Sequence, residues 1–255
     1  MPPGSAARQV LPNRDERDEV ADADHPGQTE PMVQTTAART STNWWIGFHG
    51  VFALVAVAVL LVPVPSLGMR VLLLVVGYNI ALPLLSRRTG DQRLWRTWCV
   101  LAPMSVLMVL PDWFLSAVLG SITFPDTGSP FIGTMPWFMA GMWVIALLPV
   151  MMAAMDVENA RGTTAGFLTA AIAGLALFTV AEWFAPAIPL WEPVGVAQIA
   201  GVAVYVLLPE LGLCIATYEL VRNAAKRPRP LTIGMIVAIP FMYLGMLACS
   251  YQFLG

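Results

Sequence analysis

The stretch TTAGFLTAAIAGLALFTVAEWF, Thr163–Phe184, decides the fold class of this chain. Its 22 residues hold a single charged side chain, Glu182, and show no regular alternation of polar and apolar positions. A helix needs roughly 20 consecutive, mostly apolar residues to cross the hydrocarbon core of a bilayer. The stretch is therefore predicted to be a transmembrane helix that carries one carboxyl group near its end.

The rest of the chain has the same character. Of its 255 residues, 57% are hydrophobic and only 12% are charged, whereas about 25% of the residues in soluble domains are charged. Six further apolar stretches are long enough to span a bilayer: residues 44–63, 66–86, 94–119, 135–155, 197–221 and 231–253. We predict an all-α, polytopic bundle of about seven transmembrane helices in a multi-pass protein of the cell membrane.

Two domains are expected. Residues 1–43 contain seven acids and four arginines, are rich in Pro, Thr and Ala, and lack aromatic side chains. Such a segment cannot bury enough apolar surface to fold, and it lacks the basic and apolar regions of a signal peptide. We predict a disordered cytoplasmic tail over residues 1–43 and a seven-helix transmembrane domain over 44–255.

The basic residues predict an orientation. They gather in alternate connections: Arg87, Arg88, Arg93 and Arg96; Arg161; and Arg222, Lys226, Arg227 and Arg229. The connections between them hold no Lys or Arg. The positive-inside rule then places the N-terminus in the cytoplasm and the C-terminus outside. Arg70, near the outer end of the second span, is the one basic residue that does not fit. Among the acids of the inner side, Glu219 is expected to pair with Arg222, and Asp156 and Glu158 to face solvent.

Several classes of protein are excluded by missing residues. A retinal protein needs a lysine within a helix, but Lys226, the only lysine, lies in a predicted loop. The three cysteines lie on separate spans, and no Cys-x-x-Cys pair, histidine cluster or paired-acid diphosphate motif is present. We therefore expect no metal site, no cofactor and no nucleic-acid partner.

Two similar tetrapeptides, PDWF at Pro111–Phe114 and AEWF at Ala181–Phe184, place an acid before two aromatics. Helical rise puts Asp112 and Glu182 near the outer boundary of the membrane, at similar heights. Trp113 and Trp183 could be interfacial anchors or could line a site with the two acids. The outer loop SITFPDTGSPFIGT, residues 121–134, is rich in turn-forming residues and is expected to fold back over the mouth of the bundle.

Glu210, in LLPELG at residues 207–212, is expected about thirteen residues into the sixth span, close to mid-bilayer. Ionisable groups at that depth are costly and are functional candidates. Tyr78, Asn79 and Tyr243 are expected at similar depth, and Asn79 could hydrogen-bond the Glu210 carboxyl. A neutral Glu210 could instead hold helices together as a polar bridge.

If Asp112, Glu182 and Glu210 line one cavity, they form a proton donor in an apolar, aromatic chamber. In this acid and aromatic pattern, and in its seven helices, the chain resembles the integral-membrane terpene cyclases and, more loosely, the membrane carotenoid cyclases and hydratases. It lacks the paired-Glu signature of the carotenoid cyclases. The resemblance implies metal-independent, acid-initiated cyclisation or hydration of a lipid-soluble isoprenoid through a carbocation. Its implied proton donors are Glu210, Asp112 and Glu182, and the implied substrate contacts are Asn79, Tyr78, Trp113, Trp183 and Tyr243.

Two other functions stay open. Glu210 beside Pro209 in a kinked helix also fits a coupling-ion site of a small transporter or proton-coupled permease. The other alternative is a non-catalytic accessory membrane protein, in which the acids near the outer boundary of the membrane would contact a partner. The sequence makes no prediction about the oligomeric state.

Overall fold

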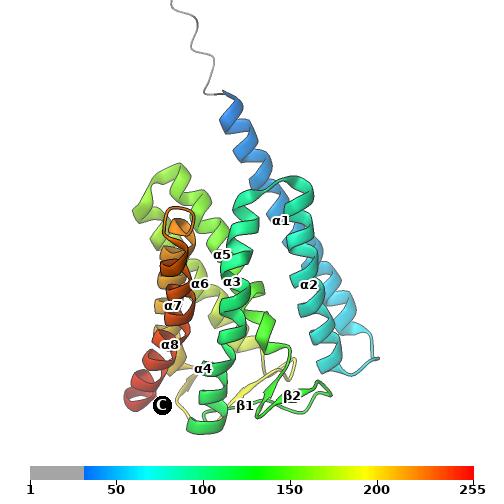
Figure 1. The fold of residues 1–255 in the computed structure, drawn as a ribbon. Coiled ribbons are helices and arrows are strands. Elements are labelled where there is room, and N and C mark those ends of the chain that lie inside the picture. The colour runs from blue at the N-terminus through cyan, green and yellow to red at the C-terminus, as the bar shows by residue number, and fades with distance from the viewer. Residues whose placement is uncertain (1–31) are drawn as a thin grey trace, which may run out of the picture.

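A computed structural model describes residues 32–255, with side chains from Trp44 onward. The chain folds as a bundle of helices capped at one end by short strands (Figure 1). The helices are α1 (Met32–Leu61), α2 (Leu67–Thr89), α3 (Gln92–Leu107), α4 (Val109–Trp113), the π-helix η1 (Phe114–Leu119), α5 (Met139–Arg161), α6 (Thr163–Phe184), α7 (Val204–Asn223) and α8 (Arg229–Leu254). With α3, α4 and η1 counted as one span, the described residues contain seven helices long and apolar enough to cross a membrane.

The expected spans are confirmed in number and place, with three shifted starts. The fourth and sixth spans begin at Met139 and Val204, later than expected, because short strands take up the residues before them. Helix α1 begins at Met32 and not at Trp44. Its backbone therefore runs into the segment predicted as a tail, since extending an existing helix costs much less than nucleating one. Residues 1–31 of that predicted tail lie outside the described residues.

Three antiparallel strand pairs lie at one end of the bundle, which we call the hairpin end (Figure 1). The pairs are β1 (Ile122–Thr123) with β4 (Glu192–Pro193), β2 (Phe131–Ile132) with β3 (Met135–Pro136), and β5 (Gln198–Ile199) with β6 (Val202–Ala203). The β1–β4 pair links two connections that lie far apart in the sequence. It therefore holds the two long loops together across the end of the bundle.

Helix α5 is central and packs against α1, α2, α3, α6 and α7. The main neighbours of α1 are α2 and α5. Within the membrane-spanning stretch of each helix, 56% of the residues of α7 but only 6% of those of α1 are buried inside the bundle. The outward side chains are apolar, such as Leu54, Ile172 and Phe253, with exposures of 74%, 67% and 87%. Such an apolar exterior suits a helix bundle surrounded by lipid, where close packing of small residues holds helices together.

Small residues bring α6 close to α7. Gly166 and Gly174 lie eight residues apart on α6, with Ala170 between them, and all three are buried. A β-carbon added at Gly166 would collide with the Tyr218 hydroxyl, and one added at Gly174 would collide with the Cys214 sulfur. This close approach fixes the position of α7, which carries Glu210.

The third span is interrupted near the hairpin end. Helix α3 ends at Leu107, Met108 forms a turn, and the short α4 passes directly into the π-helix η1. Pro111 has no N–H to donate to a preceding carbonyl, which weakens the helix at this point. Single π-helical turns are frequent at functional sites because they redirect side chains. Asp112, buried at 5% exposure, lies at this interruption.

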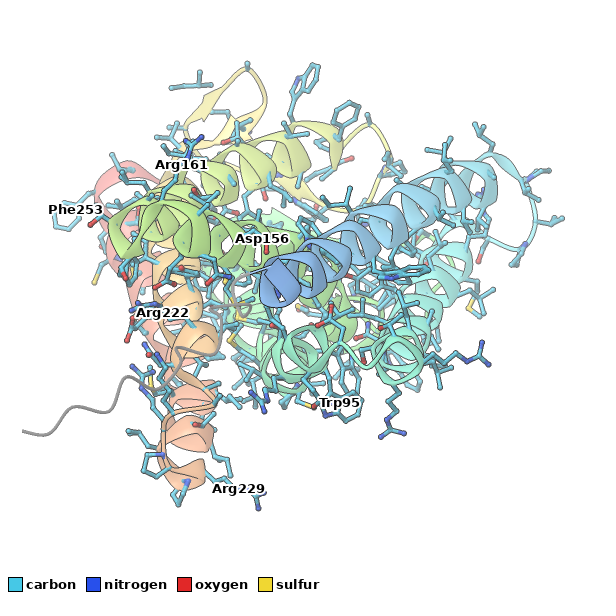
Figure 2. All side chains as sticks on the ribbon, turned by 90° about the horizontal axis from the view of Figure 1, so that it is seen from above. Trp95, Asp156, Arg161, Arg222, Arg229 and Phe253 are labelled. Atoms are coloured by element: carbon cyan, nitrogen blue, oxygen red, sulfur yellow. The ribbon has the colours of Figure 1, made fainter. Side chains whose placement is uncertain are left out.

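The opposite end, which we call the arginine end, gathers the basic residues (Figure 2). There Arg93 pairs with Asp156, which also accepts the Trp45 indole N–H at 3.1 Å. Arg222 holds Glu158 through Nε at 3.1 Å and Nη2 at 2.5 Å. The expectation that Asp156 and Glu158 only face solvent is therefore wrong, because each pairs with an arginine from another helix.

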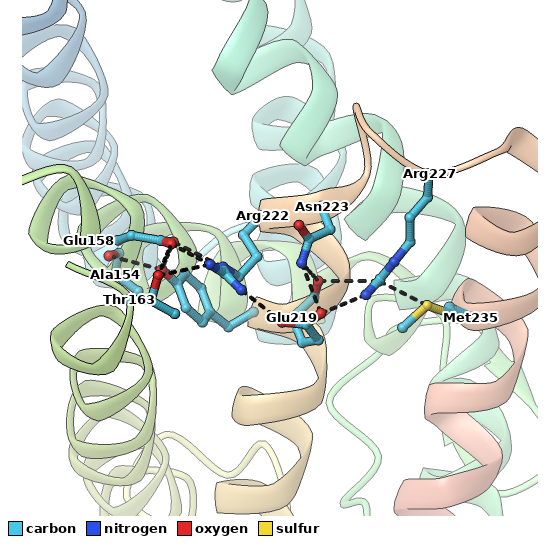
Figure 3. Close-up of polar contacts among 9 residues, drawn as sticks. Ala154, Glu158, Thr163, Glu219, Arg222, Asn223, Arg227 and Met235 are labelled. Carbon is cyan, nitrogen blue, oxygen red and sulfur yellow. Dashed lines mark hydrogen bonds and ion pairs between the residues drawn. The ribbon is translucent and has the colours of Figure 1, made fainter. Parts of the chain in front are cut away.

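Glu219 joins the second of these ion pairs (Figure 3). It accepts from Arg222 at 3.2 Å, which confirms the expected local pair, and from Arg227 at 2.6 Å and Asn223 at 2.8 Å. Tyr218 also donates its hydroxyl to Glu158. Thr163, at the start of α6, donates to Glu158 at 2.9 Å and accepts from Arg222 at 3.1 Å, so the network ties α5, α6 and α7 together.

Arg70, the exception in the charge pattern, serves the end of a helix. Its guanidinium donates to the backbone carbonyls of Leu60, at 2.5 Å, and Val62. The last carbonyls of a helix lack partners within it, and a cation there also meets the negative end of the helix dipole. Arg70 therefore caps α1.

Candidate active site

A cavity of about 290 Å³ lies toward the hairpin end, between α4, η1, α5, α6, α7 and α8. This volume is just below the range of roughly 300–1,000 Å³ typical of small-molecule sites. Loop residues Ser121, Ile122, Phe124, Trp191 and Pro193 complete its wall. Three of them belong to the loop 121–134, which confirms the expectation that this loop folds over the mouth of the bundle.

Three acids line this cavity: Asp112 from α4, Glu182 from α6 and Glu210 from α7. Asp112 and Glu210 are buried, at 5% and 3% exposure. The three carboxyls lie close enough to interact electrostatically with one another. The structure therefore brings together all three residues that the sequence suggested as proton donors.

Two of the acids are held by tryptophans from other elements. Trp143 of α5 donates its indole N–H to Asp112 Oδ2 at 2.9 Å. Trp191, in the loop after α6, donates its indole N–H to Glu182 Oε1 at 3.0 Å. Each bond fixes the direction of one carboxyl group and leaves the other oxygen of that group for a further partner.

Glu210 is different. Its buried Oε2 has no hydrogen-bond partner among the described residues. None of the described residues that line the cavity is basic, and no salt bridge in the described part of the chain reaches any of the three acids. A buried polar atom without a partner is costly, and its presence in a native fold calls for an explanation such as a catalytic role.

The position of Glu210 corrects the sequence estimate. Because α7 begins at Val204, Glu210 is its seventh residue and lies only about 9 Å along the helix from that start. The later start of α7 thus shortens the expected thirteen residues to seven. A mid-bilayer position of Glu210 stays a prediction.

Asn79, the expected partner of Glu210, makes other hydrogen bonds. Its amide donates to the carbonyls of Val75 at 2.9 Å and Gly141 at 3.2 Å, and its Oδ1 faces the Trp98 indole N–H at 3.4 Å. The interaction predicted between Asn79 and Glu210 is therefore wrong. Asn79 joins α2 to α3 and α5.

Tyr78 also lies outside the acid-lined cavity. Its hydroxyl contacts His49 Nε2 at 2.8 Å, and its ring packs edge-on against Phe52 with centroids 4.8 Å apart. It lines a separate apolar groove between α1 and α2. Tyr78 does not lie beside Glu210, because a position along a helix does not determine which neighbouring helices the side chain contacts.

Trp113 and Trp183 do not line the cavity either. They are 44% and 58% exposed, although the acid before each one points into it. Successive residues of an α-helix are about 100° apart around its axis, so the residue that follows an inward-pointing acid can turn away from the cavity, as both tryptophans do. The tryptophans that bind the acids, Trp143 and Trp191, come instead from elsewhere in the chain.

An aromatic wall surrounds the acids. The Trp143 ring lies 5.4 Å from that of Phe178 and 5.7 Å from that of Tyr243, between centroids. Tyr243 is thus the one expected substrate contact that the structure places in the cavity. The Tyr205 hydroxyl lies 2.9 Å from Ser121 Oγ.

Sequence reasoning missed Trp143, Phe178, Tyr205 and Ser121. The one signal for Trp143 is its indole N–H inside an apolar span, because a buried indole N–H usually has a hydrogen-bond partner. The others carry no signal that separates them from ordinary core residues. Within the described part of the chain, no three His, Cys, Asp or Glu side chains are arranged to hold a metal ion.

Fold and cavity together define a class: a helical membrane protein with an acid-lined apolar chamber. The chain belongs to the family called domain of unknown function DUF6989, whose model matches residues 109–254. Every residue that lines the chamber lies within that match, whereas α1, α2 and α3 precede it. No curated protein and no solved structure matches the chain.

Proposed function

We propose that the protein is a membrane enzyme that cyclises or hydrates a lipid-soluble isoprenoid through a carbocation, with a carboxylic acid of the cavity as the proton donor. The observation that carries this proposal is the convergence of Asp112, Glu182 and Glu210 in one apolar, aromatic chamber without a basic residue. The proposed resemblance to the integral-membrane terpene cyclases rests on the same arrangement.

The electrostatics support proton donation. Like charges in a cavity of low dielectric repel strongly, so carboxyls that interact there share protons and do not all ionise together. A neutral carboxylic acid next to an olefin or epoxide is a general acid. Glu210 is the proposed donor, because its Oε2 accepts no N–H hydrogen bond that would favour the ionised form of the carboxyl.

The other acids have supporting roles in this proposal. Asp112 and Glu182, each held by an indole N–H, face the developing positive charge from fixed directions. Preorganised groups of this kind stabilise a transition state without reorganising during the reaction. The rings of Trp143, Phe178 and Tyr243 add their electron-rich faces, which attract a cation more strongly when water is excluded.

The proposal includes an orientation. We place the arginine end in the cytoplasm of a cell whose plasma membrane holds the protein, following the positive-inside rule. The hairpin end and the cavity then lie toward the outer leaflet, where an isoprenoid dissolved in the bilayer can reach them. A cysteine at exposed Ala225 and one at exposed Thr134 should react with a membrane-impermeant maleimide from opposite sides of intact cells.

The activity test uses purified protein in lipid nanodiscs with linear, epoxidised and aryl-linked isoprenoids and no added metal. Cyclisation gives an isomer of the substrate, and hydration adds one water; either is detected by mass spectrometry. Wild type should form such a product and Glu210→Gln should not. Glu192→Gln is the matched control, because Glu192 is an exposed acid at the same end that does not line the cavity.

If no isoprenoid of the three kinds is converted, the enzyme proposal fails. The transporter reading then leads, because an unpartnered Glu210 beside Pro209 also suits a coupling-ion site. Proton uptake into proteoliposomes driven by a substrate gradient, and lost in Glu210→Gln, would favour it.

A further inference from the structure

We propose that the cavity is a binding site for a lipophilic organic cation, an ammonium group on an apolar body, and that the cation binds in exchange for a proton. The inference concerns binding alone and involves no chemical conversion. It rests on the cavity geometry and on the unpartnered carboxyl of Glu210.

The charge of the cavity is the first support. Three carboxyls line it and no basic residue does, among the described residues. Isolated ionised carboxylates are very costly in an apolar environment, so the three acids of a cavity without a countercharge do not all ionise together. An organic cation supplies the missing countercharge and lets a carboxyl release its proton to solvent, with charge conserved at every step.

The unpartnered carboxyl of Glu210 is the second support. Glu210 is 3% exposed, and its Oε2 has no partner. Asp112 and Glu182 already accept indole N–H bonds. Glu210 therefore offers the cation an acceptor that makes no hydrogen bond to the protein.

The walls match such a ligand. The Trp143 ring packs against the rings of Phe178 and Tyr243, with centroids 5.4 and 5.7 Å away. Aromatic faces bind quaternary ammonium groups, and the attraction grows as water is removed. Met139, Met142, Ile145 and Leu177 form an apolar surface for the rest of the ligand.

The groups that could exchange a proton in this region come from four elements. Those that line the cavity or interact electrostatically with Glu210 are Asp112 of α4, Glu182 of α6, Tyr205 and Cys214 of α7, and Tyr243 of α8. Tyrosine and cysteine stay neutral at pH 7 in an apolar site. The exchanged proton therefore comes from one of the three carboxyls, and the unpartnered carboxyl of Glu210 is its source in this proposal.

The test compares two probes of nearly the same shape in nanodiscs of zwitterionic lipid. Benzyltrimethylammonium carries a permanent positive charge, and neopentylbenzene is its neutral carbon isostere. Binding and proton release are measured by calorimetry in two buffers with different enthalpies of ionisation. The cation should bind at least about tenfold more tightly than the isostere and release about one proton.

Variants assign the effect to the acids. Glu210→Gln should weaken binding of the cation by about tenfold or more and abolish proton release, and Asp112→Asn should weaken binding as a second, independent variant. Glu192→Gln should bind as wild type does. Equal affinity for the two probes, or unchanged affinity and proton release in Glu210→Gln, would overturn the inference.

The outcome is separate from that of the enzyme proposal. A protein that binds the cation and releases a proton but converts no isoprenoid would keep this inference and reject the enzyme. A protein that converts isoprenoids but does not distinguish the two probes would keep the enzyme and reject this inference.

Discussion

The acids at the two ends of the bundle have opposite surroundings. At the arginine end, Glu158 pairs with Arg222, and Glu219 pairs with Arg222 and Arg227 (Figure 3). Toward the hairpin end, three acids share a cavity that no described basic residue lines. In both places the acids come from several helices that pack together.

The difference separates structural acids from functional candidates. An acid that pairs with an arginine has its charge balanced within the fold, and removing either partner leaves the other uncompensated. The charge of an acid that has no cationic partner does not stabilise the fold. Its charge or its proton is therefore available to a ligand. Four substitutions test this comparison, described from the largest expected effect to the smallest.

Glu210→Gln should lower the rate of isoprenoid conversion by about 10²–10⁴-fold, the usual contribution of a general acid. The free energy of unfolding should change by less than about 1 kcal/mol, because the substitution keeps the shape and removes no hydrogen bond seen in the fold. Product formation and thermal unfolding are measured on the same preparation. A large loss of stability with unchanged activity per folded molecule would show that Glu210 only bridges helices.

Arg222→Gln should have the reverse effect. It removes the arginine that pairs with Glu158 and one of the two arginines that pair with Glu219, and both acids are partly buried. We expect a loss of about 1–3 kcal/mol in the free energy of unfolding, between the values for exposed and buried pairs, and unchanged activity per folded molecule. Arg229→Gln, at an exposed arginine of the same end, is the control. An unchanged unfolding midpoint in Arg222→Gln would contradict a structural role for the pair.

Trp143→Phe keeps an aromatic ring and removes the N–H that binds Asp112. The loss of one hydrogen bond to a charged or polar group, about 1–1.5 kcal/mol, corresponds to roughly a tenfold lower rate. If Trp143 positions Asp112 for the reaction, kcat should fall while KM stays within about twofold. Trp137→Phe, at a tryptophan 50% exposed near the same end, should change neither constant. A change in KM alone would assign Trp143 to substrate binding.

Trp183→Phe should have the smallest effect, within about 0.5 kcal/mol on stability and with no change in rate, because Trp183 is exposed and does not line the cavity. Lipids brominated in their acyl chains should quench the fluorescence of a variant that keeps only Trp183 more than that of one that keeps only Trp143. Equal quenching would contradict the outward position of Trp183.

Much of the fold could be predicted because apolar length dominates in a membrane. The seven spans and the pair of Glu219 with Arg222 follow from local sequence. The start of α7 could not be predicted, since residues 197–203 are nearly as apolar as the helix. They form a hairpin whose turn, Ala200–Gly201, has positive φ at both positions. An Ala at the first of these positions gives no turn signal of the kind that Asn would give.

Less of the site could be predicted, because it depends on which helix faces meet. Polarity inside apolar spans identified Asp112, Glu182 and Glu210, and all three line the cavity. Expected depth alone then suggested Tyr78 and Asn79, which do not line the cavity and hydrogen-bond to other residues. Trp113 and Trp183 were suggested by their position next to Asp112 and Glu182 in the sequence, but the helix turns both side chains away from the cavity.

The most direct test of the account is conversion of an olefinic isoprenoid in D₂O by purified protein in nanodiscs. If a cavity acid protonates the substrate, its solvent-exchanged deuteron ends on carbon. The product of wild type should then carry one deuterium at a position that does not exchange, and Glu210→Gln should form almost no product. A product without deuterium on carbon, or undiminished deuteration by Glu210→Gln, would contradict the claim that Glu210 supplies the proton.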